Sequence, residues 1–69
     1  MLIFVYTFWF ASGQQLVVER EAHTRLWRPV QSLELCHKIA AEHEARHKRS
    51  IALGNGVIVD VTVTCARKM

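Results

Sequence analysis

The sequence predicts a small α+β domain of ββαβ order, a two-layer domain in which one helix packs on one face of a three-stranded antiparallel sheet. Three patterns support this prediction. Residues 2–10 are rich in aromatic and β-branched side chains, residues 33–53 show a helical repeat, and residues 57–64 alternate valines with other residues. Because the chain has 69 residues, we expect a single domain over 1–69.

The first predicted strand, residues 2–10, is apolar on both of its faces. A strand with one exposed face alternates apolar and polar residues, so this one is expected at the centre of the sheet. One helix covers only one face, and the other face is expected to bind a partner, first of all a second copy of the chain. The two faces carry Leu2, Phe4, Tyr6, Phe8 and Phe10, and Ile3, Val5, Thr7 and Trp9.

A turn and a second strand follow the first strand. Residues 11–15 predict a turn in which Gly13 is free to take a positive φ, and residues 16–20 predict the strand that closes a hairpin. Residues 21–31 are polar and irregular. They contain Trp27, and an isolated tryptophan in a loop is typical of a side chain that covers the edge of a core. The alternative interpretation of Trp27 is a binding contact.

The helix is predicted to begin after Ser32, a suitable N-cap. Its end has two interpretations. The helix ends near Arg49, followed by a short strand at 51–53 and a turn at 54–56, or it runs to Leu53 with Gly54 as the C′ residue. We prefer the longer helix. Its apolar side carries Leu33, Leu35, Cys36, Ile39, Ala40, His43 and His47.

The last predicted strand, residues 57–64, must pair with an open edge of the hairpin. Pairing with the first strand gives the order 2-1-3, with all neighbours antiparallel. This order puts the doubly apolar strand in the centre, and it leaves the face opposite the helix with a surplus of apolar side chains. We expect a homodimer that forms through this sheet face or through an edge strand.

The cysteine content and the N-terminus indicate the compartment. Cys36 and Cys65 are too few for a disulfide framework, so we expect two buried free thiols. The apolar N-terminus has no Lys or Arg before its apolar run, which is unlike a signal peptide. It is also shorter than the about 20 apolar residues that a transmembrane helix needs. A soluble, cytoplasmic chain with no membrane partner is therefore expected.

The run His43-Glu44-Ala45-Arg46-His47 matches the H-E-x-x-H pattern of zinc hydrolases. In those enzymes two histidines one turn apart share a metal, and the glutamate activates a water. Here no histidine follows His47, and Asp60 is the only later acidic residue, so a third ligand is not evident. We expect no enzyme, no cofactor and no metal, and we expect both histidines to pack at the helix–sheet interface. Zinc binding through His43 and His47 is the third interpretation of function.

The chain carries nine Lys and Arg against six acidic residues, a net charge of +3. This surplus permits contact with nucleic acid but does not require it. Glutamates one turn earlier are placed to pair with some of the helical cations, which favours a solvated face. Nucleic-acid binding is the alternative function. Its candidate residues are Arg46, Lys48, Arg49, Arg67 and Lys68.

An aromatic first strand ending in Ser12-Gly13, then Pro29 and Ser32 before a helix and a Val-rich last strand, resembles short uncharacterised proteins of phages and mobile elements. The resemblance implies a role in binding and blocking a host protein, as anti-CRISPR proteins do. The preferred prediction is a small non-enzymatic interaction module that is a homodimer and binds a partner protein. Its expected interaction residues are Ile3, Val5, Trp9 and Trp27.

Overall fold

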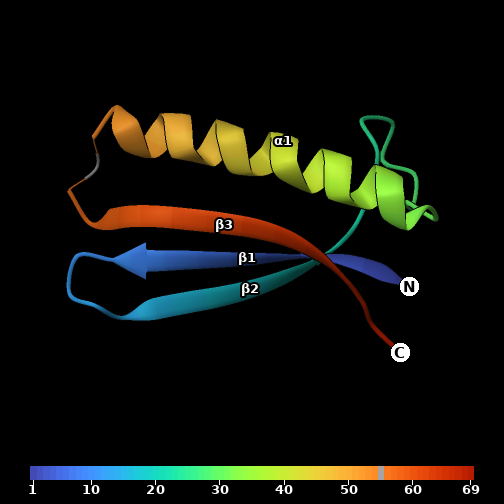
Figure 1. Ribbon diagram of the computed structural model, residues 1–69, viewed down its shortest axis with the longest axis horizontal. Helices are drawn as coiled ribbons and strands as arrows, with labels where there is room; N and C mark the ends of the chain where they lie inside the picture. Colours follow the sequence, from blue (N-terminus) through green and yellow to red (C-terminus); the bar gives the residue numbers. More distant parts are fainter. Residues whose placement is uncertain (55) are drawn as a thin grey trace.

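A computed structural model describes residues 1–54 and 56–69. The elements in chain order are β1 (Leu2–Phe10), β2 (Gln15–Glu21), α1 (Leu33–Ala52) and β3 (Ile58–Arg67). The sheet has the order β2-β1-β3, with both pairs antiparallel. Figure 1 shows α1 along one side of this sheet, so the predicted fold class and strand order are confirmed.

The core lies between α1 and the two strands beneath it. The face of β1 that carries Phe4 points toward the helix, where Val61 and Val63 of β3 pack in the same cluster. On this face Phe4 lies opposite Cys65 of β3. Phe4 and Val61 have no exposed surface. The buried cluster consists of Leu2, Phe4, Ala22, Val30, Cys36, Ala40, Val61 and Val63.

Local sequence signals set both ends of the helix. Ser32 is the N-cap, and its hydroxyl oxygen accepts a hydrogen bond from the Leu35 backbone N–H at 3.3 Å. Leu53 is the C-cap, and Gly54 follows with φ 91°, a conformation that favours glycine. The longer of the two predicted helices is therefore confirmed. The alternative turn at 54–56 includes residue 55, which lies outside the described residues.

Cys36 and Cys65 form a disulfide that joins the first turns of α1 to the second half of β3. The prediction of two free thiols is wrong. The reason is topological: α1 starts over the strand end that carries Cys65, and the Cα atoms of the two cysteines are 6.0 Å apart. This separation lies within the range of disulfide geometry.

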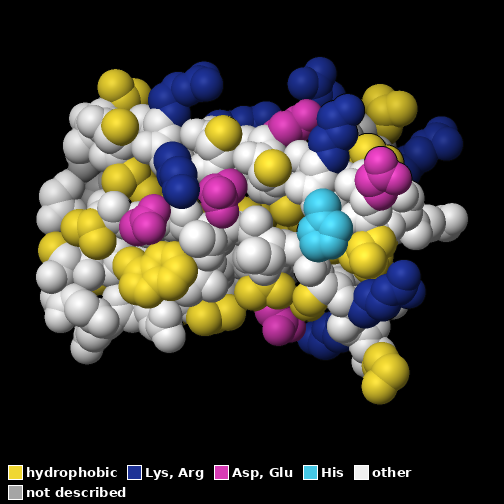
Figure 2. All heavy atoms as spheres, in the orientation of Figure 1, with side chains coloured by type: hydrophobic (Ala, Val, Ile, Leu, Met, Phe, Trp, Pro, Cys, Tyr) yellow, Lys and Arg dark blue, Asp and Glu magenta, His cyan; other side chains and the backbone are white. Residues whose placement is uncertain are grey.

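The helix is displaced toward one edge of the sheet. Within the part of the chain that the structure describes, α1 contacts β3 and β1 but not β2. The helix-facing residues of β2 are consequently more open, and Leu16 is half exposed. Figure 2 shows Lys and Arg side chains along the helix and near the chain termini, with apolar side chains scattered over the sheet. The described part of the chain contains no helix with both the length and the hydropathy needed to cross a bilayer.

The disulfide predicts a measurable loss of stability on reduction. It closes a loop between residues 29 positions apart. The chain-entropy model gives about 3–4 kcal/mol for a loop of this size. We expect a reducing agent to lower the free energy of unfolding of the wild-type chain by this amount, and its urea midpoint with it.

The matched control is the double variant Cys36→Ala, Cys65→Ala. Its midpoint should already be low and should not move when the reducing agent is added. Equal midpoints for the oxidised and reduced wild-type chain would contradict a disulfide that stabilises the fold.

Candidate functional site

A groove of about 720 Å³ lies on the helix side of the sheet, over the strand that α1 leaves uncovered. The sheet forms its floor, the second half of α1 forms one wall, and the loop 22–31 forms the other. It is lined by Tyr6, Phe8, Val18, Arg20, Glu21, His23, Trp27, Pro29 and His47.

The floor and the helical wall of the groove are aromatic. The rings of Tyr6 and Phe8 lie parallel, with centroids 6.4 Å apart. His47 meets both rings edge-on, at 5.7 Å from Tyr6 and 5.9 Å from Phe8. These contacts fix the wall relative to the floor, so the apolar surface of the groove is pre-formed.

The opposite wall is a tight turn at residues 24–28, which we call the Thr24 turn. The Thr24 hydroxyl oxygen accepts hydrogen bonds from the backbone N–H groups of Leu26 at 3.2 Å and Arg28 at 3.4 Å. The Thr24 backbone carbonyl accepts from the Trp27 N–H at 2.9 Å, and the Thr24 N–H donates to the Arg28 carbonyl at 2.9 Å. The turn is therefore rigid although it lies at the surface.

The Thr24 turn presents two large apolar side chains to solvent. Leu26 is 77% exposed and Trp27 is 79% exposed. One face of the indole stacks on the His23 imidazole, with centroids 4.3 Å apart. The expectation that Trp27 covers the edge of the core is wrong, because His23 takes that place against Phe4. The alternative, a binding contact, agrees with this exposure.

Trp27 also has an unusual backbone. Its φ is 61°, the only positive value among the described residues other than glycine. A bulky residue in this conformation costs about 1–3 kcal/mol, and such strain is concentrated at functional sites. The hydrogen bonds of Thr24 hold this backbone in place, so the turn keeps the indole at the mouth of the groove.

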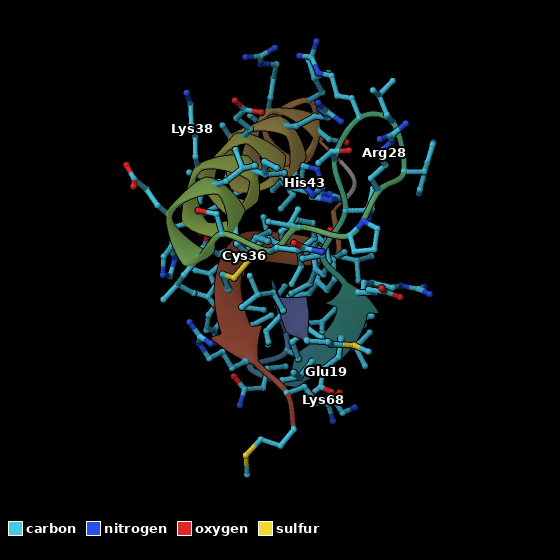
Figure 3. The ribbon with its side chains drawn as sticks, turned by 90° about the vertical axis from the view of Figure 1, so that its right-hand side faces the viewer. Glu19, Arg28, Cys36, Lys38, His43 and Lys68 are labelled. Atoms are coloured by element: carbon cyan, nitrogen blue, oxygen red, sulfur yellow. A yellow bond between two sulfur atoms is a disulfide. The ribbon has the colours of Figure 1, made fainter. Side chains whose placement is uncertain are left out.

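His43 links the helix to the sheet behind the groove (Figure 3). Its Nδ1 lies 3.0 Å from the Tyr6 hydroxyl, a hydrogen bond, and its ring lies 5.0 Å from that of Phe4. Burial lowers the pKa of His43, and the nearby Arg46 lowers it further. Burial also raises the pKa of the Tyr6 hydroxyl.

The histidines and the glutamate of the motif His43-Glu44-Ala45-Arg46-His47 make contacts on different sides of α1. Both histidines pack against aromatic rings of the sheet, as predicted for the helix–sheet interface. The Glu44 carboxylate instead accepts a hydrogen bond from the Val63 backbone N–H at 3.0 Å. It is therefore not placed to activate a water on a metal held by the histidines. Within residues 1–54 and 56–69, no group of three or more His, Cys, Asp or Glu side chains could hold a metal ion.

The predicted nucleic-acid residues do not form one surface. Arg46, Lys48 and Arg49 lie on the second half of α1, whereas Arg67 and Lys68 lie at the far end of β3 (Figure 1). Two of these five basic side chains also lie close to carboxylates. Lys48 Nζ lies 3.8 Å from Glu44 Oε2 and 4.0 Å from Asp60 Oδ1. Lys68 Nζ lies 3.2 Å from Glu19 Oε1.

The predicted interaction residues divide between the two faces of the sheet. Ile3, Val5 and Trp9 lie on the face opposite α1, and Trp27 lies beside the groove. Ile3 is only 6% exposed and offers little surface to a partner, while Val5 and Trp9 are half-buried. The groove could not be predicted from the sequence, because it depends on the fold of the loop 22–31 and on the offset of α1.

Comparison of the chain with protein-family models, with curated proteins and with solved structures gives no significant match. Function must therefore be inferred from the geometry of the chain itself.

The lowered pKa of His43 predicts a loss of stability in mild acid. The unfolded chain takes up this proton near the ordinary pKa of 6.5, whereas the folded chain resists it. The unfolded state thus binds more protons as pH falls through this value. We expect the free energy of unfolding to be constant above about pH 7.5 and to fall toward about pH 5.

His43→Gln removes the titrating group and leaves an amide that can bond to the Tyr6 hydroxyl, so it should flatten this pH dependence. His37→Gln, on the exposed side of the same helix, is the matched control and should keep the wild-type slope. Urea unfolding at a series of pH values measures the free energy of unfolding of the wild type and of both variants. Equal slopes for His43→Gln and the wild type would contradict the assignment to His43.

Proposed function

We propose that this chain is a non-enzymatic interaction module that binds a partner protein through the aromatic groove and the Thr24 turn. The observation that supports this most is the exposure of Leu26 and Trp27 on a rigid turn. Exposed apolar side chains on a hydrogen-bonded scaffold bind with little loss of conformational entropy.

The composition of the groove supports a protein partner. Trp, Tyr and Arg are the residue types that dominate binding energy at protein interfaces, and Trp27, Tyr6 and Arg20 line the groove together. This composition favours a protein-binding surface.

A second candidate function is the binding of single-stranded nucleic acid. Arg25 and Arg28 are exposed on either side of Trp27 in the same turn. An exposed indole between cations can stack on a base while the cations contact phosphates. Salt dependence separates the two functions, because phosphate contacts weaken steeply as salt rises, whereas an apolar interface changes little.

The biological setting stays a prediction. The resemblance to short phage and mobile-element proteins suggests that the partner is a host protein, which the chain would block by occupying a surface. The disulfide argues against the cytoplasmic location predicted from the sequence. Disulfides such as Cys36–Cys65 persist mainly in oxidising compartments.

The test is capture of proteins from a nuclease-treated cell lysate by the immobilised chain. The variant Leu26→Ala, Trp27→Ala should fold and should lose partner proteins that the wild type retains in a wash of about 0.5 M salt. Leu53→Ala is the matched control, because Leu53 is 85% exposed at the end of α1, away from the groove. It should retain the same proteins as the wild type.

Two results would contradict the proposal. Capture that disappears entirely after nuclease treatment would favour the nucleic-acid function. Equal capture by the wild type, Leu53→Ala and the double variant would remove the Thr24 turn from the binding surface. Circular dichroism of each variant verifies that a loss of capture is not a loss of fold.

A further inference from the structure

The two edges of the sheet differ in how their backbone groups are satisfied. On β3, the outward N–H of Val61 donates to Asp60 Oδ1 at 2.8 Å, and that of Val63 donates to Glu44 Oε1 at 3.0 Å. An acidic side chain from α1 thus occupies the β3 edge. Covering an edge in this way prevents another strand from pairing with it.

On the β2 edge, within the described part of the chain, a side chain reaches only the Glu21 carbonyl, which lies 3.2 Å from His23 Nδ1. Phe10 N–H donates to the Gln14 carbonyl and Ala22 N–H to the Leu2 carbonyl, so even-numbered residues of this hairpin arm bond to β1. The backbone groups of Val17 and Glu19 therefore point outward, and within the described part of the chain they have no hydrogen-bond partner. The edge is also apolar in its first half, where Leu16 and Val17 are 50% and 53% exposed.

We propose that β2 pairs with β2 of a second copy of the chain, antiparallel about a two-fold axis at Val18, so that two sheets join into one of six strands. The inference rests on the proposed function, because the pairing extends the binding groove over two copies. An isologous pairing of this kind closes on itself and leaves no further open β2 edge.

The charged residues of β2 all lie opposite uncharged residues in this register. All seven residues of the strand pair, and Val17 lies opposite Glu19 of the second copy. Gln15 likewise lies opposite Glu21 of the second copy. A shift of two residues toward the C-terminus would instead put Glu19 opposite Glu19, and like charges directly opposite are destabilising. The full-length register therefore avoids repulsion while forming the largest number of backbone hydrogen bonds.

The pairing also covers the open apolar side chains of β2. The two Val18 side chains meet at the axis, and Leu16 lies opposite Arg20 of the second copy, where the stem of the arginine can pack on it. Antiparallel pairing about an axis normal to the sheet keeps both helices on one side. The two grooves then lie next to each other, with both Thr24 turns on the same face of the dimer.

The mass in solution gives the first test. Light scattering at about 100 μM should give twice the 7.9 kDa of one chain. Val17→Pro removes an outward N–H without touching the β1 ladder, and it should weaken association at least tenfold. Arg67→Pro is the matched control, because it removes an outward N–H at the β3 edge, and it should remain dimeric. A wild-type monomer at this concentration would overturn the proposal.

Cysteine cross-linking tests the register. Both native cysteines are occupied in the Cys36–Cys65 disulfide. Val18→Cys should form a covalent dimer on mild oxidation, since the two side chains meet at the axis. Val17→Cys and Thr64→Cys should stay monomeric on a non-reducing gel. Cross-linking through Thr64→Cys instead would place the contact on the open sheet face and overturn pairing at β2. A monomer that still captures proteins through Trp27 would remove this inference alone and leave the proposed function standing.

Discussion

The position of α1 over β3 determines both the groove and the open edge of the sheet. Two interactions at different points along the helix fix it. The Cys36–Cys65 disulfide ties its first turns to β3, and the Glu44 carboxylate bonds to the backbone of Val63 farther along. A helix centred on a three-stranded sheet would shield all three strands. Here the offset brings Glu44 to the β3 edge and leaves β2 without a helical cover. The groove and the open edge both follow from this single displacement.

The Thr24 turn and His43 complete the groove on the other side. The loop 22–31 returns beside the helix, and His23 fills the space between Trp27 and the core. His43 couples the two layers through the Tyr6 hydroxyl. The His43 imidazole resists protonation here, because burial lowers its pKa. Acid should therefore weaken both the contact between helix and sheet and the groove built on it. The aromatic surface is thus positioned by the polar and covalent contacts behind it.

The sequence was sufficient for the elements and their order. The apolar character of residues 2–10 on both faces identified the central strand, and Ser32 and Gly54 marked the helix ends, because these signals act locally. The disulfide could not be predicted, since it depends on where the helix start crosses a strand 29 residues away in the chain. The role of Glu44 could not be predicted from the sequence either. Its position in the H-E-x-x-H pattern suggested metal chemistry, whereas the carboxylate bonds to a strand edge. The exposure of Trp27 depends on the turn around Thr24, and no periodic pattern of residues predicts that turn.

Amide hydrogen exchange measured residue by residue tests the difference between the two sheet edges most directly. We expect the Val61 and Val63 amides to be protected at every protein concentration, because side chains of the same chain accept their hydrogen bonds. The Val17 and Glu19 amides should exchange rapidly in dilute solution and become protected as the concentration rises. Rapid exchange at Val63, or protection of Val17 and Glu19 in dilute solution, would contradict the account.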